Sequence, residues 1–211
     1  MTRILLTGFG PFDGQSVNAS WLAVQEVAAR WTGPEELVVR ELPVSFRAAR
    51  QQLRSAVAEV TPDLVVCVGE AGGASAVRVE RVAVNVIDAR IPDVDGSAPI
   101  DVPVIAGAPA AFFSTLPVKA CAAAVRDAGV PVEVSNSAGL YVCNATFYAL
   151  QHLLTTTDAR SGFVHVPRTP AQVAAGAPSL GVEEAATGLL AVLRAALSTT
   201  TDLRVSAGTL A

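Results

Sequence analysis

The chain has 211 residues, of which 51% are hydrophobic, so it can form one large domain with a full core and is not disordered. Its formal charge of −4, from 15 basic and 19 acidic residues, leaves no basic excess for a phosphate backbone, and nucleic acid is not an expected partner. No apolar run reaches the roughly 18 residues of a membrane span, and residues 1–10 are too short for a signal peptide. We therefore expect a soluble, cytoplasmic protein without membrane contact.

The chain has three cysteines, an odd number, and none of them is in CxxC spacing. This pattern argues against a disulfide framework and against a zinc site. A cysteine with a special role is therefore expected to act as a thiol.

Short apolar runs alternate with segments of helical period in the first third of the chain, which is typical of an α/β fold with a largely parallel sheet. The first helix is expected to begin at Asn18 or Ser20, either of which can serve as the cap, and to end before Gly33. Strands are expected at 3–8, 37–42 and 63–69, and a second helix at 46–60.

The pattern changes after residue 76, because 77–87 alternates with period two and predicts a longer antiparallel strand or a hairpin arm. Residues 88–117 are irregular and predict a surface excursion of the kind that borders a site. The sequence as a whole predicts a single α/β domain over 1–211, with a mostly parallel twisted sheet, helices on both faces and a tail that frays after about residue 199. Further helices are expected at 118–127, 143–154 and 182–197, and further strands at 132–135 and 162–166.

Cys143 lies where the turn-forming residues 136–139 give way to a helical pattern. Unpaired N–H groups and the positive end of a helix favour a thiolate there, and the same N–H groups can hold the oxyanion formed when a carbonyl is attacked. The alternative is a small buried hydrophobe, which is the usual state of a free cysteine. Cys67 and Cys121 are better explained as core residues.

A thiol nucleophile needs a base, and His165 is the better placed of the two histidines, because it ends a predicted strand just before Pro167. His152 is most simply a residue on a helix face. Glu80 is the candidate to orient the imidazole, since its strand phase places a carboxylate among apolar side chains, where it needs a partner. Two alternatives stay open. His165 can be a structural histidine at a strand end, and Glu80 can form an ion pair with Arg78 or Arg81 instead.

The sequence resembles the type I pyroglutamyl peptidases, also called pyrrolidone-carboxylate peptidases, nearly from end to end. The order Glu, Cys, His and its intervals of 63 and 22 residues are similar to the family pattern. The segments that carry the resemblance are "TGFGPFDG", "NASW", "VVCVGEAGG", "ERVAVNVIDARIPD", "SNSAGLYVCN" and "GFVHVP".

The resemblance implies an α/β cysteine exopeptidase that removes N-terminal pyroglutamate from peptides through a thioester, requires no metal or organic cofactor and often forms homo-oligomers. It implies that Cys143 is the nucleophile, His165 the general base and acid, Glu80 the orienting carboxylate and Arg90 a helper of the oxyanion. The residues implied to bind substrate are Phe9 and Phe12 as apolar walls, Asn18 and Glu70 as polar groups, and Tyr141 and Val142 on the opposite side.

Two readings compete for the first loop. "GFGPFDG" joins a strand to a helix as phosphate-binding loops do, but Asp13 occupies the third glycine position of G-x-G-x-x-G and no G-K-[ST] follows. A phosphate cradle is therefore disfavoured. Ordinary core packing remains the alternative for Phe9 and Phe12.

The chain departs from the family pattern at several positions, and Glu70 matters most because the family usually has an amide or apolar residue there. An ionised glutamate accepts hydrogen bonds but cannot donate one, and a buried one needs a raised pKa or a cation. Two alternatives follow: a related amidase or acyl transferase with a changed pocket, and a non-catalytic binding domain of the same fold. The other departures are Ala19, Ala74, Arg168 and Thr169.

Overall fold

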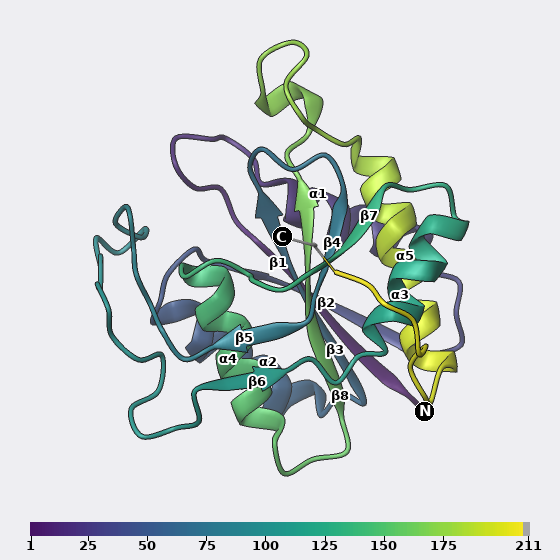
Figure 1. The fold of residues 1–211 in the computed structure, drawn as a ribbon, viewed down its shortest axis with the longest axis horizontal. Helices are drawn as coiled ribbons and strands as arrows, with labels where there is room; N and C mark the ends of the chain where they lie inside the picture. Colours follow the sequence, from purple (N-terminus) through teal and green to yellow (C-terminus); the bar gives the residue numbers. More distant parts are fainter. Residues whose placement is uncertain (209–211) are drawn as a thin grey trace.

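A six-stranded sheet forms the middle layer of the molecule (Figure 1). The computed structural model describes residues 1–208. Along the sheet the strand order is β2-β1-β3-β8-β4-β7, in which the first four are parallel, β4 is antiparallel to β8, and β7 is parallel to β4. Mostly parallel pairing is therefore confirmed. The strands are β1 (Arg3–Phe9), β2 (Glu36–Leu42), β3 (Leu64–Ala71), β4 (Val77–Glu80), β7 (Val132–Ser135) and β8 (Arg160–Pro167).

The expected antiparallel element at 77–87 is present as two short strands rather than one long one. The first is β4, and the second is β5 (Val82–Val84), which leaves the main sheet and pairs antiparallel with β6 (Ala111–Phe113). Strand β6 falls inside the stretch expected to be irregular. Ile87, just before that excursion, forms an isolated antiparallel bridge with Val102 within it, and the N–H of Ala89 donates to the carbonyl of Pro99.

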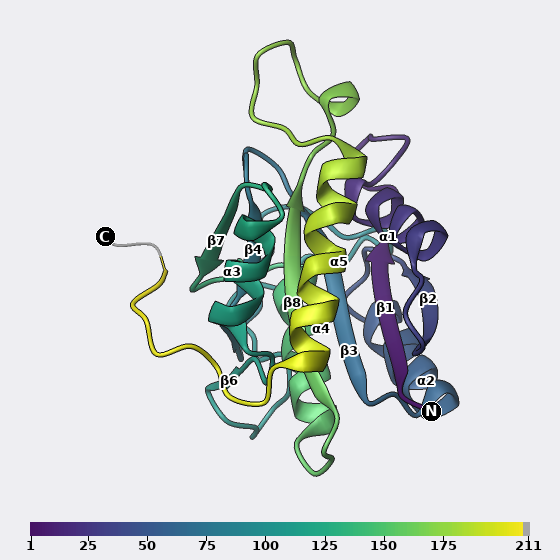
Figure 2. The ribbon, with the colours of Figure 1, turned by 90° about the vertical axis from the view of Figure 1, so that its right-hand side faces the viewer.

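Helices cover both faces of the sheet, as the sequence predicts (Figure 2). On one face α1 (Ala19–Arg30), α3 (Val118–Asp127) and α5 (Val182–Ser198) share an aliphatic core with β1, β3, β4 and β8. On the other face α2 (Ala48–Val60) and α4 (Val142–Leu154) pack against each other and enclose a core rich in aromatic rings. A short 3₁₀ helix, η1 (Pro170–Gln172), follows β8.

The sequence explains why α1 begins where it does. Asn18 is the N-cap, and its Oδ1 accepts a hydrogen bond from the backbone N–H of Ser20, which satisfies one of the free donors of the first turn. Gly8 lets β1 approach this turn closely, because a Cβ at position 8 would lie 2.8 Å from the Cα of Trp21. The loop after β1 and the start of α1 are therefore held against each other.

The chain after α5 contacts the body of the domain. The carboxylate of Asp202 accepts hydrogen bonds from the N–H groups of Lys119 and Ala120 at the start of α3, and Arg81 donates to the carbonyl of Ala207. The expected fraying of the tail stays a prediction, and its last residues, 209–211, lie outside the described part of the chain. Within residues 1–208 no helix combines the length and apolar character that crossing a bilayer requires.

Candidate active site

Helix α4 presents Cys143 at its start. Tyr141 is the N-cap and Cys143 is the second helical residue, so its sulfur lies at the positive end of the helix. The side chain is only partly buried, whereas Cys67 and Cys121 are buried completely. Burial raises the pKa of each of these two thiols to about 12 and keeps them protonated. Among the three thiols, Cys143 alone combines accessibility with a helix start.

Asn144 fixes the start of α4 against β5. Its Oδ1 accepts from the N–H of Val84 at 3.0 Å, and its Nδ2 donates to the carbonyls of Val84 and Val86 at 2.9 and 3.0 Å. The side chain is fully buried, so these three bonds satisfy groups that water cannot reach. The residue next to the thiol is therefore held in place by these bonds, a role that no sequence pattern indicated.

His165 and Glu80 form a buried pair on the same face of the sheet as α4. Nδ1 of His165 donates to Oε1 of Glu80 at 2.8 Å, and the exposed fractions of the two side chains are 8% and 0%. Since Nδ1 faces the carboxylate, Nε2 is the nitrogen left to face the sulfur of Cys143. The imidazole thus lies between the thiol and the carboxylate.

The two neighbours of the imidazole decide its charge. Burial by itself lowers the pKa of His165, but the charge and hydrogen bonding of Cys143 and of Glu80 act in the opposite direction and raise the pKa to about 10. The arrangement therefore favours an imidazolium between Cys143 and Glu80. A thiolate beside an imidazolium is the reactive form of a cysteine nucleophile, and this site brings together the two side chains that such a pair requires.

The alternative ion pair of Glu80 with a neighbouring arginine is not found. Arg78 forms an ion pair with Glu133 on β7, and Arg81 points to the carbonyl of Ala207. Oε2 of Glu80 has no hydrogen-bond partner among the described residues and is buried. Because a buried carboxylate is costly without a cation, the imidazolium is the group that stabilises it.

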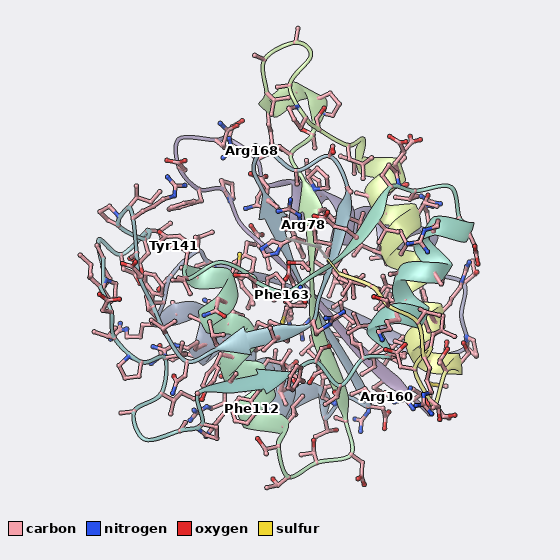
Figure 3. The ribbon with its side chains drawn as sticks, viewed as in Figure 1. Arg78, Phe112, Tyr141, Arg160, Phe163 and Arg168 are labelled. Carbon is pink, nitrogen blue, oxygen red and sulfur yellow. The ribbon has the colours of Figure 1, made fainter. Side chains whose placement is uncertain are left out.

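Gly69 makes room for the sulfur. A Cβ at this position would lie 2.9 Å from Sγ of Cys143 and 2.9 Å from the ring of Phe163. Phe163 lies near the middle of the molecule (Figure 3) and its ring centroid is 4.9 Å from that of His165. A side chain at position 69 would displace either the sulfur of Cys143 or this ring.

Aromatic rings gather beside the thiol. The centroid of the Tyr141 ring lies 5.6 Å from that of Phe12 and 5.1 Å from that of Phe46, and its hydroxyl donates to the carbonyl of Pro92. Phe12 remains partly exposed, whereas Phe9 is buried and packs on Phe163. The predicted wall residues therefore divide into an accessible pair, Phe12 and Tyr141, and a supporting layer beneath.

Val142 and Asn18, two further residues predicted to bind substrate, are buried. Val142 is 1% exposed and belongs to the core under α4. Asn18 is 8% exposed, donates to the carbonyl of Gly10 through Nδ2, and accepts from the backbone and the hydroxyl of Ser20 through Oδ1. Its amide therefore organises the loop after β1.

Glu70 is held by three protein donors. Oε1 accepts from Nε of Arg168 at 2.9 Å, and Oε2 accepts from the N–H of Ala19 and from Nε2 of Gln172, each at 2.8 Å. Because Gly69 faces Cys143, the next residue of β3 points to the opposite face, toward the start of α1. Arg168, which directly follows β8 (Figure 3), supplies a cation for this partly buried carboxylate.

Arg90, the predicted helper of the oxyanion, lies in the excursion after β5 and is exposed. It is close enough to Tyr141 to counteract part of the rise in the pKa of that phenol, which burial and Asp93 raise to about 12. Its side chain makes no hydrogen bond or ion pair with the residues that the structure describes.

The described residues include no group of three or more His, Cys, Asp or Glu side chains that could hold a metal ion.

Known proteins are similar to this chain in sequence and fold. The family model for pyroglutamyl peptidase matches residues 2–199. The chain belongs to the pyroglutamyl peptidase family. The pyrrolidone-carboxylate peptidases of Clavibacter michiganensis and Streptomyces coelicolor are both 52% identical to it, with 100% and 99% of each chain covered, respectively.

Solved structures of the family agree with the architecture described above. The crystal structure of pyroglutamyl peptidase I from Bacillus amyloliquefaciens superposes with a TM-score of 0.93 at 36% identity, covering 97% of this chain and 99% of that one. Pyrrolidone carboxyl peptidase from Thermococcus litoralis also gives a TM-score of 0.93 at 35% identity, with 98% and 100% covered. The resemblance expected from the sequence motifs is confirmed.

The sequence motifs indicate Cys143, His165 and Glu80, but they do not indicate the residues that hold these three side chains in position. Asn144 and Gly69 both lie inside the quoted motifs, yet their roles depend on contacts with β5 and with the sulfur. Gln172 donates to Glu70 and to the carbonyl of Val17. It lies in η1, which no periodic pattern in the sequence predicts.

Proposed function

We propose that this chain is a cysteine exopeptidase that removes an N-terminal pyroglutamyl residue from peptides, with Cys143 as nucleophile, His165 as base and acid, and Glu80 as the orienting carboxylate. The observation that carries the proposal is the position of the His165 ring, which has Glu80 on Nδ1 and Cys143 as its other partner. Membership of the pyroglutamyl peptidase family supports the substrate.

The reaction follows from these positions. The thiolate of Cys143 attacks the pyroglutamyl carbonyl, and the negative oxygen that forms is stabilised by the free N–H groups at the start of α4, with Arg90 as a second donor. The imidazolium of His165 gives its proton to the departing amine, which leaves a thioester. His165 then takes a proton from water, the hydroxide attacks the thioester, and the thiolate and free pyroglutamate are released.

The pocket suits an uncharged lactam. Pyroglutamate carries no ammonium group, so its ring needs apolar walls and a few hydrogen bonds rather than a charge. Phe12 and Tyr141 supply accessible walls over Phe9 and Val142, and Asn18 holds the loop that borders them. We assign Glu70 to this pocket through its bond to Ala19 N–H, which fixes the residue next to Asn18.

Two further parts of the proposal concern the state of the protein in the cell. Three free thiols support the cytoplasm as its compartment, since disulfides are rare there. Exposed apolar side chains in and beside the excursion support a homo-oligomer, and the most exposed are Phe113 at 70%, Ile100 at 65% and Val94 at 51%.

A fluorogenic assay tests the reaction. We expect the chain to release aminomethylcoumarin from its pyroglutamyl amide, and we expect Cys143→Ser to reduce that release by about a thousandfold or more. Brief treatment with iodoacetamide should modify Cys143 and abolish turnover, while Cys67 and Cys121 stay unmodified because their pKa values are about 12.

The outcomes separate the proposal from its alternatives. Fast labelling of Cys143 without turnover of the pyroglutamyl amide would indicate an amidase with another substrate. Equal labelling of all three thiols without turnover would indicate a binding domain. Turnover that survives in Cys143→Ser would refute the assigned nucleophile.

A further inference from the structure

A cleft lies away from Cys143, between α2 and the second half of α4. It has a volume of 610 Å³, which is in the range of small-molecule sites. His152 lines it on α4 and follows Cys143 by nine residues, roughly 14 Å along the helix axis. The proposed peptidase reaction uses neither this cleft nor this histidine.

One wall of the cleft is unusually basic. Arg47, Arg50 and Arg54 line it from the first turns of α2, and their spacing of three and four residues places them along the same side of the helix. No carboxylate lines the cleft, and none of the three arginines forms a salt bridge within residues 1–208. This concentration of positive charge contrasts with the formal charge of −4 for the whole chain.

Nearby acidic groups have other partners. Asp93 accepts from the N–H of Phe46, and Asp95 accepts from the hydroxyl of Ser45, so both are used at the turn before α2. Glu59, at the far end of α2, pairs with Arg40. The protein itself therefore does not neutralise the arginines that face the cleft.

Arg50 is held rigidly in this wall. Its Nε donates to the carbonyl of Phe46 and its Nη1 donates to the carbonyl of Val104 at 2.7 Å, so two hydrogen bonds anchor the guanidinium at this wall. Burial, with the charge of Arg54 added, lowers the pKa of Arg50. Like charges on adjacent turns destabilise a helix, and an anion between them would offset that cost.

The remaining wall is of a different kind. Ile105, Ala149 and Leu153 give it an apolar surface, and the His152 ring stands at its border, 6.0 Å from the ring of Phe112. A ligand for this cleft therefore combines a strongly anionic group with room for a less polar part. Guanidinium forks match phosphate oxygens in geometry, and linked phosphates place several charges within a short span.

We propose that the cleft between α2 and α4 binds a small molecule that carries two or more linked phosphate groups, held by Arg47, Arg50 and Arg54. This binding site is separate from the proposed peptidase site and does not depend on it.

Calorimetric titration of the full chain with inorganic tripolyphosphate at low salt tests the proposal. We expect saturable binding that weakens as salt is added, because screening reduces the contribution of exposed charges. Arg54→Gln should weaken binding about fivefold or more, and the double variant with Arg47→Gln about twentyfold or more. Both arginines are exposed, so the variants keep the fold, which the melting temperature checks.

Arg194→Gln is the matched control. Arg194 is an exposed helical arginine on α5, on the opposite face of the sheet, and its loss changes the net charge by the same amount as the loss of Arg54. Its effect on binding should be less than about twofold. The proposal is overturned by an absence of saturable binding, by equal weakening in Arg194→Gln and Arg54→Gln, or by tighter binding of citrate than of tripolyphosphate.

Discussion

Nδ1 of His165 and Oε1 of Glu80 lie 2.8 Å apart, although the two residues belong to strands of opposite direction. Strand β4 places Arg78 opposite His165, so the Glu80 side chain reaches the ring from two residues further along. The pair is removed from solvent, which strengthens its electrostatic interaction relative to a surface pair. The geometry resembles that of catalytic triads in which a carboxylate orients an imidazole.

Replacement of Glu80 with glutamine should remove the charge and keep the shape. The neutral amide no longer stabilises an imidazolium. If its NH₂ group faces Nδ1 of His165, it donates a hydrogen bond there and favours the tautomer that carries its proton on Nε2. We expect kcat to fall by about a hundredfold or more with little change in KM. Steady-state kinetics on the pyroglutamyl amide measures this, and a loss confined to KM would contradict the orienting role.

The raised pKa of His165 predicts a pH dependence of stability. An unfolded histidine loses its proton near pH 6.5, whereas the folded one keeps it up to about pH 10. Between these values the native state binds more protons at His165 than the unfolded state does, so the contribution of His165 to the free energy of unfolding is fully present below pH 6.5 and decreases as pH rises toward 10.

Urea unfolding between pH 6 and pH 8.5 measures this effect. The buried thiols of Cys67 and Cys121, with pKa values of about 12, contribute a similar loss only when the pH approaches the pKa of an unfolded thiol, near 8.5. Glu80→Gln should flatten the curve in this window. An identical slope in the variant and the parent would show that another group titrates.

Asn144→Ala should damage both stability and activity. The substitution leaves the N–H of Val84 and the carbonyls of Val84 and Val86 without their buried partner, which costs about 2–4 kcal/mol of unfolding free energy. Cys143 follows the displaced helix start, so kcat should fall by about tenfold or more.

Asn144→Asp provides a comparison for this change. It keeps an acceptor for Val84 N–H but places a second oxygen against the two carbonyls, so it should be at least as destabilising as alanine. Chemical denaturation and the fluorogenic assay give the two readouts. Full activity in a destabilised Asn144→Ala would show that the hydrogen bonds of Asn144 are not needed to position Cys143.

Gly69→Ala tests the space beside the sulfur. The new methyl group would lie 2.9 Å from both Sγ of Cys143 and the Phe163 ring, so one of them must move. We expect a stability loss of about 1–3 kcal/mol from overpacking and a fall in kcat of about tenfold or more.

Gly181→Ala is the control, because a Cβ there would meet only the flexible end of Glu184 at 3.2 Å. It should leave both quantities nearly unchanged. Normal kinetics in Gly69→Ala would show that the slot is more adaptable than its contacts indicate.

Local patterns predicted most of the regular elements. The run from Val118 to Asp127 forms α3 with the expected bounds, because its apolar spacing faces a single core. Strand β6 was not predicted, since it has three residues and its partner β5 lies far away in the chain. A ladder between remote segments leaves no periodic signal in either segment.

The sequence indicated the candidate site residues but not which of them contact one another. The strand phase of Glu80 indicated a carboxylate in need of a partner, but it could not choose between His165 and an arginine. Only the antiparallel crossing of β4 and β8 brings the imidazole into reach. The sequence did not indicate the partner of Glu70 for the same reason. Arg168 is 98 residues away along the chain, yet its side chain donates a hydrogen bond to Glu70 in the folded protein.

The ion pair of Glu70 with Arg168 should stabilise the loops around the proposed pocket. The side chains are 11% and 29% exposed, so the pair is shielded more than a surface pair. Glu70→Gln removes the charge while one amide oxygen can still accept from Ala19 N–H. We expect a loss of about 1–2 kcal/mol in unfolding free energy and a rise in KM larger than the fall in kcat.

A double-mutant cycle isolates the pair. Arg168→Met alone should cost more stability than it does in the Glu70→Gln background, because in the parent it leaves a partly buried carboxylate without its cation. A coupling energy of about 1 kcal/mol or more in urea unfolding would support the pair. Strictly additive effects would mean that Glu70 is held by Ala19 and Gln172 alone, and that Arg168 serves another purpose at the end of β8.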